Sequence, residues 1–232
     1  MGAIAPVPTV DARVTSTTRC DRDLAWSTSP MRTDPFSDTL TFLTEGYWAT
    51  PTFWVILIVS LAIAALAFRS LPEQRTVDHL VRYMVRGVIG LMWWQQSLWK
   101  VPSDFEGLRH WTEEIVKNAA FPIHAKLVND LILTHFVPFG YVIYFTEVAI
   151  GISLIFGLFV RASAVVGALL ILNLYFGLYR LESEWPWTYA FLVLLMVLFA
   201  VERYGRSLGA DALIAARSDK PQGIMRVLAM LT

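Results

Sequence analysis

The chain has one cysteine, no net charge and no run of basic residues, and these absences exclude several classes of protein. A single cysteine, Cys20, excludes an internal disulfide and any zinc or iron–sulfur site built from thiolates. Acidic and basic residues number 19 each, so the sequence shows no electrostatic footprint for nucleic acid. No His-x-x-His or Glu-x-x-His spacing occurs, and we expect no metal site.

Long apolar stretches are what the sequence contains most of, since 56% of its residues are hydrophobic. A helix needs about 20 apolar residues to cross roughly 30 Å of hydrocarbon. Backbone amides cannot stay unpaired in lipid, so such stretches must be helices. We therefore predict an all-α, polytopic membrane protein whose five spans are Thr52–Phe68, Gly87–Trp99, Leu131–Val160, Ala162–Tyr179 and Trp185–Val201.

Composition divides the chain into four parts. Residues 1–50 are a polar tail with a short interfacial helix predicted over Phe36–Thr44, and residues 51–70 form an additional span. Residues 82–216 form the main membrane domain, which includes an outer loop at 102–130. Residues 217–232 form a C-terminal tail. We see no cleavable secretory signal at the start.

Arginine placement predicts the orientation, because basic residues favour the cytoplasmic side of a membrane. Basic residues follow the first, third and fifth spans, whereas the loop at 102–130 is of mixed charge. We therefore expect the N-terminus outside and the C-terminus in the cytoplasm.

The outer loop carries the pattern of an amphipathic helix. Ser103 and Glu106 have capping-box spacing, which stabilises a helix start. Leu108, Trp111 and Ile115 then recur at helical spacing. This helix lies flat on the outer leaflet or covers the mouth of the bundle as a lid; the sequence leaves both open.

Glu147 is the principal candidate site residue, because it lies about 21 Å along its helix from Arg161, near the middle of the bilayer. A carboxylate at that depth is protonated, hydrogen-bonded or functional. Gln95, Asn173 and Tyr189 lie at a similar depth on three other spans. We predict one hydrogen-bonded layer around Glu147.

That layer has two interpretations. It is either a structural network that fixes helix register, or a proton relay with a quinone-head site in which Glu147 exchanges the proton. Trp94 is a candidate stacking surface for such a ring, packing being the alternative. Lys100, at the end of the second span, is expected to extend outward to water.

From Arg82 onward the chain resembles the DoxX family, including its DoxD branch. Three segments carry the resemblance: Arg86–Lys100, Glu147–Arg161 and Tyr204–Leu213. The resemblance implies a four-helix membrane bundle, with residues 51–70 as one extra N-terminal helix. The family includes the membrane subunit of thiosulfate:quinone oxidoreductase, and the bacterial inner membrane is the location that this implies.

Two functions follow as hypotheses. The chain is a redox-associated subunit that passes electrons from an outer reductant, with a sulfur compound as candidate, to quinone. It carries no motif for a cofactor of its own, so it needs a partner subunit. Alternatively, it is a non-catalytic accessory subunit of a larger bioenergetic or photosynthetic complex. Whether the chain is itself an enzyme is left open; lipid and other membrane subunits are the expected partners.

Overall fold

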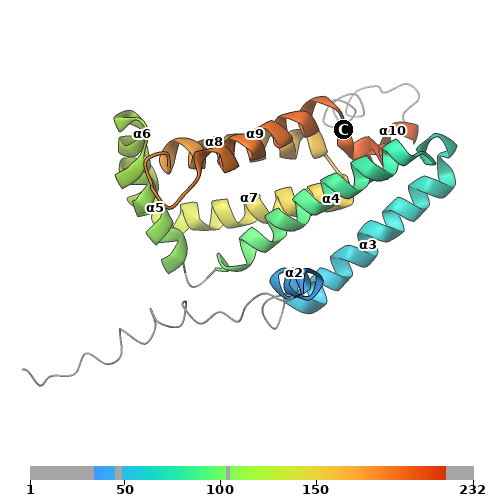
Figure 1. Ribbon diagram of the computed structural model, residues 1–232, viewed down its shortest axis with the longest axis horizontal. Coiled ribbons are helices and arrows are strands. Elements are labelled where there is room, and N and C mark those ends of the chain that lie inside the picture. Colours follow the sequence, from blue (N-terminus) through green and yellow to red (C-terminus); the bar gives the residue numbers. More distant parts are fainter. Residues whose placement is uncertain (1–33, 45–48, 103–104, 218–232) are drawn as a thin grey trace, which may run out of the picture. The chain divides into compact units, whose positions relative to one another are not determined.

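The structure of the chain is a computed structural model that describes residues 34–44, 49–102 and 105–217 (Figure 1). The predicted capping-box residue Ser103, Cys20 and most of both polar tails lie outside these residues. Every regular element in the described part is helical, so the predicted all-α class is confirmed there. Residues 1–39 form a separate unit from residues 40–232. The short helix predicted near Phe36 is present as α2 (Pro35–Thr44).

Within the described ranges, three helices are long and apolar enough to cross a membrane: α3 (Ala49–Ser70), α7 (Phe136–Phe156) and α8 (Val160–Gly177). The shorter apolar helix α9 covers Pro186–Val201. These helices confirm the predicted integral-membrane character. Helix α4 (Val77–Leu98) begins earlier than the predicted span, and Asp78 and Arg82 lie in its first turns.

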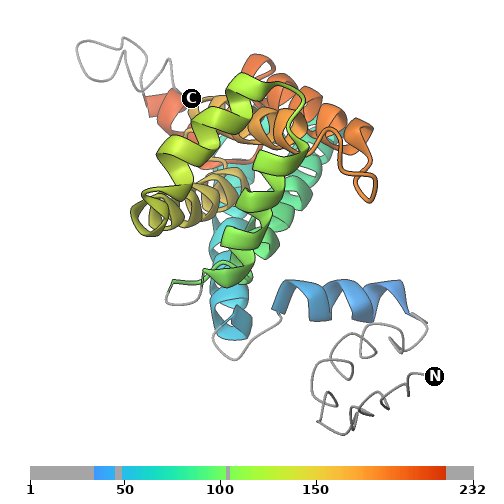
Figure 2. The ribbon, with the colours of Figure 1, turned by 90° about the vertical axis from the view of Figure 1, so that its left-hand side faces the viewer.

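The predicted span Gly87–Trp99 falls in α4, which is not among the helices that are long and apolar enough to cross a membrane. The long helices of the second unit pack as neighbouring pairs. Helix α4 packs along α7, and α8 packs along α9, while α3 lies against α7 (Figures 1 and 2). A Cβ atom at Gly151 would lie only 3.0 Å from the backbone nitrogen of Trp94. Glycine therefore lets α4 and α7 approach backbone to backbone, as small residues do between membrane helices. The shared core contains Ile89, Leu154 and Phe199.

One end of the bundle is fastened around a buried arginine. The Arg86 side chain is fully buried and donates hydrogen bonds to the carbonyl oxygens of Leu154, Ile155 and Ser207. These carbonyls lie at the end of α7 and in the turn that precedes α10 (Ala210–Arg217). Arg86 therefore joins α4 to two segments that are distant in sequence.

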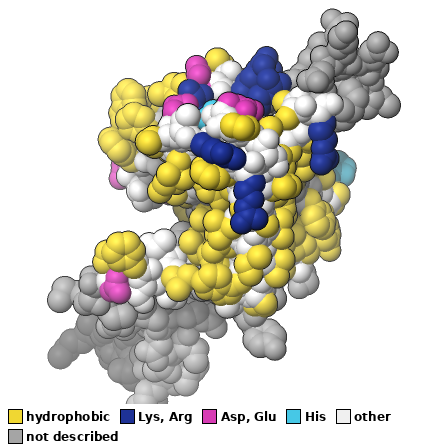
Figure 3. All heavy atoms as spheres, turned by 90° about the vertical axis from the view of Figure 1, so that its right-hand side faces the viewer, with side chains coloured by type: hydrophobic (Ala, Val, Ile, Leu, Met, Phe, Trp, Pro, Cys, Tyr) yellow, Lys and Arg dark blue, Asp and Glu magenta, His cyan; other side chains and the backbone are white. Residues whose placement is uncertain are grey.

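Asp211 of α10 completes this end, which we call the α10 end. Its carboxylate accepts hydrogen bonds from the backbone N–H groups of Phe159 (2.8 Å) and Val160 (3.2 Å), at the start of α8. The carboxylate thus satisfies amides that a helix start leaves free. Exposed arginines gather at the α10 end, at Arg69, Arg75, Arg203 and Arg217 (Figure 3).

The long span predicted from Leu131 is shorter than expected at both ends. A π-helical turn (η2, Val128–Leu133) comes first, and α7 begins only at Phe136. Helix α7 ends at Phe156 because Gly157 has a left-handed backbone (φ +67°), a conformation that stops a helix.

The opposite end of the bundle is built differently, because α4 stops alongside the middle of α7. Just beyond the end of α4, Lys100 contacts Glu147, which lies about 16 Å along α7 from Phe136. The ring of Phe105 packs edge-on against Phe136 and Tyr141, in the first half of α7. Helix α5 (Glu106–Asn118) and the short α6 (Pro122–Leu127) close this end, which we call the α5 end.

Candidate functional site

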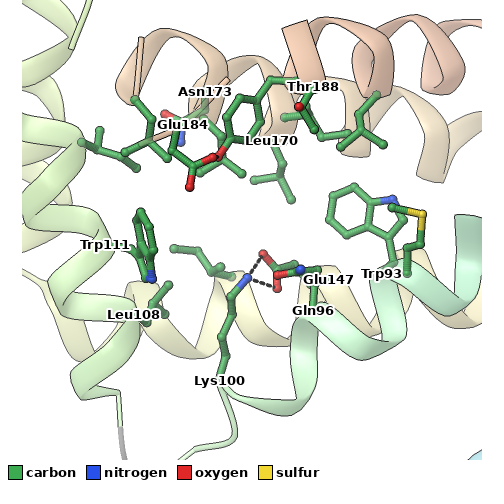
Figure 4. Close-up of a pocket in the computed structure, with 18 of the residues that line it drawn as sticks. Trp93, Gln96, Lys100, Leu108, Trp111, Glu147, Leu170, Asn173, Glu184 and Thr188 are labelled. Carbon is green, nitrogen blue, oxygen red and sulfur yellow. Dashed lines mark hydrogen bonds and ion pairs between the residues drawn. The ribbon is translucent and has the colours of Figure 1, made fainter. Parts of the chain in front are cut away.

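A cavity of about 550 Å³ lies where α4 stops short. It separates the α4–α7 pair from the α8–α9 pair, and α5 closes one side of it (Figure 4). Its volume falls within the range typical of small-molecule sites. About half of the lining side chains are aliphatic, counting Met92. The polar or aromatic ones are Trp93, Gln96, Trp99, Lys100, Trp111, Thr112, Glu147, Asn173, Glu184, Thr188 and Tyr189.

A buried ion pair forms one polar wall of the cavity. The Lys100 ammonium nitrogen lies 2.6 Å from each carboxylate oxygen of Glu147. Each residue is only 7% exposed, so the pair is shielded from bulk water. The ammonium also lies 4.6 Å from the centre of the Trp99 ring, within cation–π range. The predicted burial of Glu147 is therefore confirmed.

The expectation that Lys100 extends outward is wrong. It assumed that α4 crosses the whole membrane, which would place Lys100 at the water interface. Since α4 ends beside the middle of α7, the side chain lies at the depth of Glu147 instead. A buried ammonium and a buried carboxylate each need a partner, and here each supplies the other.

The opposite wall carries the polar groups of α8 and α9. Asn173 is hydrogen-bonded through its side-chain oxygen to His124 Nε2 (2.9 Å), and the Tyr189 hydroxyl donates to Glu184 (2.9 Å). Both residues line the same cavity as Glu147, as the sequence predicts. Their hydrogen bonds, however, run to His124 and Glu184 and not to Glu147. The cavity therefore separates two polar groups instead of holding the one continuous network that the sequence predicts.

Two predicted binding residues lie next to the cavity-lining ones in sequence. Gln96 and Trp93 line the cavity, whereas Gln95 and Trp94 are not among its lining residues. Trp94 is 3% exposed, packs against Phe53 of α3, and its indole N–H donates to the carbonyl oxygen of Leu43. Adjacent helical residues point about 100° apart, so depth alone could not distinguish them.

Helix α5 covers the cavity on the predicted apolar face. Leu108, Trp111, Thr112 and Ile115 all line the cavity, which favours the lid interpretation over a helix lying apart from the bundle. Backbone hydrogen bonds fasten the end of this helix to the α8–α9 turn. They run from Ala120 N–H to Phe176 and from Arg180 N–H to Asn118. The lid is therefore attached to the α8–α9 pair.

Two charged residues of the cavity were missed by the sequence reasoning. Glu184 lies in the tight α8–α9 turn, and only its hydrogen bond to Tyr189 brings it to the cavity. Lys100 was taken for an interfacial residue. No group of three His, Cys, Asp or Glu side chains in the described ranges lies close enough together to hold a metal ion.

Comparison of the chain with family models, with curated proteins and with solved structures gives no match in any of the three. Its likeness to the DoxX family therefore stands on the sequence motifs alone. What the cavity can do follows from its geometry. Two polar walls face each other across an apolar space, an arrangement suited to a flat ring with hydrogen-bonding groups at opposite edges (Figure 4).

Proposed function

We propose that this chain is the membrane subunit of a DoxX-like redox complex and that its cavity binds the head group of a quinone. The observation that carries the proposal is the Lys100–Glu147 pair facing Asn173 and Tyr189 across one cavity. A quinone ring has oxygens at opposite edges, and both walls offer hydrogen-bond donors. Trp93 and Trp111 offer aromatic surface between them.

In this proposal α4, α7, α8 and α9 form the four-helix DoxX-like bundle and α3 is the added helix. The chain lies in the bacterial inner membrane, with the exposed arginines of the α10 end toward the cytoplasm. The α5 end and the N-terminus then face outward. The cavity then lies beneath α5, in the half of the bundle nearest the side from which an outer reductant would deliver electrons.

The proposed reaction converts a quinone to a quinol with two electrons and two protons. A partner subunit supplies both electrons by oxidising an outer reductant, for which a sulfur compound is the candidate. The Lys100–Glu147 pair supplies the first of the two protons to one ring oxygen and is reprotonated from water at the α5 end, with Glu147 as the group that exchanges it. The second proton comes from the Tyr189 hydroxyl, which donates a hydrogen bond to Glu184. In the reaction this hydroxyl turns to the opposite ring oxygen, gives up its proton there and regains one from water through Glu184.

The test is quinone turnover by the purified native complex carrying Glu147→Gln. We expect quinone reduction to be abolished and the complex to remain assembled, because Gln keeps the shape of the side chain but cannot exchange a proton. Glu113→Gln is the matched control, since Glu113 lies on α5 but does not line the cavity. Unchanged turnover would remove the proton role.

The alternative function, a non-catalytic accessory subunit, gives a different outcome. Loss of the complex in the Glu147→Gln variant would assign the buried pair to assembly. Isolation in mild detergent, followed by identification of co-purifying subunits, quinones and pigments, separates the two functions. A redox enzyme subunit and bound quinone favour the proposal, whereas a pigment–protein complex without quinone favours the alternative.

A further inference from the structure

The exposed residues among those that line the cavity indicate where it reaches the surface. Of the residues that line it, Met92, Gln96, Trp99 and Thr188 are exposed, and the others are buried or half-buried. Met92 and Gln96 lie on α4, Trp99 directly follows its last residue, and Thr188 lies on α9. We call this opening the mouth. It lies between α4, which belongs to the α4–α7 pair, and α9, which belongs to the α8–α9 pair.

In the membrane placement of the proposed function, the deeper part of the mouth faces lipid rather than water. Met92 and Gln96 lie within α4, before its last residue Leu98, and α4 itself ends beside the middle of α7. An exposed side chain at this depth in a membrane bundle is surrounded by hydrocarbon. The same face of α4 continues away from the cavity with exposed Met84 and Val88, which is the composition of a lipid-facing stripe.

Gln96 is unusual in this position. Its Oε1 accepts a hydrogen bond from the Trp99 indole N–H at 3.3 Å, which directs the NH₂ group elsewhere. Within the described part of the chain, that NH₂ group donates no hydrogen bond. The Gln96 side chain lies on the cavity wall beside Glu147 (Figure 4). An amide donor in an apolar cavity without an acceptor is unfavourable, so a ligand oxygen would satisfy a group that the protein leaves unpaired.

We propose that the ligand enters sideways from the lipid through this mouth, that Gln96 donates a hydrogen bond to an oxygen of its ring, and that an apolar tail stays outside in the bilayer. This inference rests on the proposed function and narrows the ligand to a tail-bearing quinone. A ligand that entered from the outer water would have to displace α5, which is fastened to the α8–α9 turn.

The first test compares Gln96→Leu with Gln95→Leu in equilibrium binding of a short-tailed quinone to the purified protein. Loss of the Gln96 donor weakens binding by about tenfold, while the adjacent Gln95, which does not line the cavity, changes it by less than about twofold. Equal affinities for the two variants would overturn the role of Gln96.

The second test locates the tail with a quinone analogue that carries a photoreactive diazirine on it. In lipid vesicles, labelling that excess unlabelled quinone suppresses should map to α4 or α9 at the mouth. Suppressible labelling on the cavity face of α5 would place the tail inside and overturn lateral entry, while quinone binding itself would stand. Absence of any suppressible labelling, together with no saturable binding in the first test, would overturn the proposed function as well.

Discussion

The ammonium group of Lys100 contacts both carboxylate oxygens of Glu147, a residue that lies 47 positions later in the sequence. This ion pair lies just beyond the end of α4 and beside the middle of α7. Their contact explains why a cavity exists at all. Because α4 ends beside the middle of α7, it leaves a space next to the rest of α7. The ion pair forms one polar wall of that space. The same contact therefore pairs two buried charges in the cavity wall and contains Glu147, the residue that we propose exchanges a proton.

Removing one member of this pair should be more damaging than removing both. Lys100→Met leaves a buried carboxylate without a partner, and we expect it to lower the free energy of unfolding by about 3–5 kcal/mol. Lys100→Met combined with Glu147→Leu should cost much less, because no unpaired charge remains. Denaturant unfolding in detergent micelles measures both. Equal losses would show that packing, and not charge pairing, sets the stability of this region.

Gly157 should tolerate no side chain. Its φ of +67° is a left-handed conformation, and an added Cβ would lie 2.6 Å from Arg86 Nη1 and 2.7 Å from the Cα of Gly209. We expect Gly157→Ala to lower the free energy of unfolding by at least about 2 kcal/mol, from backbone strain and displacement of Arg86.

Gly87→Ala is the matched control for Gly157→Ala. Gly87 lies inside α4 with nothing within 4 Å of an added Cβ, so alanine there should leave stability unchanged or raise it by up to about 1 kcal/mol. Thermal unfolding in the same detergent compares the two variants. Similar midpoints would contradict the tight packing of the α10 end.

Asp211, outside the membrane-spanning helices, should make stability depend on pH. Burial raises the pKa of its carboxyl from 3.8 to about 6, against the opposing effect of the hydrogen bonds from Phe159 and Val160 and of the charges of Arg86 and Arg206. The folded state then binds a proton more tightly than the unfolded state between these two values. The stability contribution of Asp211 therefore falls as pH rises from about 4 to about 6, by no more than about 3 kcal/mol.

The measurement is the unfolding free energy of the wild type and of Asp211→Asn at several pH values from 4 to 8. The difference between the two proteins should change across the window from 4 to 6 and be constant above about 7. A difference that stays constant throughout would show that the buried carboxyl does not titrate there.

The sequence predicted which segments are apolar helices better than it predicted where each helix begins and ends. Uncharged runs gave α3, α8 and α9 to within a few residues, because length and hydropathy decide whether a helix can span. The start of α7 was placed too early, since Leu131 and Ile132 are as apolar as the helix that follows. Only the π-helical turn, which composition does not reveal, separates them.

The sequence predicted the level at which the candidate site residues lie along their helices. It did not predict which side chains contact one another there. Counting residues from Arg161 placed Glu147 at mid-depth among buried neighbours, and the structure agrees. The partner of Glu147 depends on where α4 stops relative to α7, which is set by tertiary packing and not by local pattern. The choice between Gln95 and Gln96 depends on helix rotation, for the same reason.

The central claim is that the cavity beside Glu147 holds a quinone ring, and equilibrium binding of a short-tailed quinone to the purified protein tests it most directly. Leu170→Phe fills part of the cavity, whereas Leu169→Phe adds the same bulk on a side chain that is 62% exposed outside it. The account predicts saturable one-to-one binding that Leu170→Phe weakens by about tenfold or more and Leu169→Phe leaves nearly unchanged. No saturable binding by the wild type, or equal weakening by the two substitutions, would contradict it.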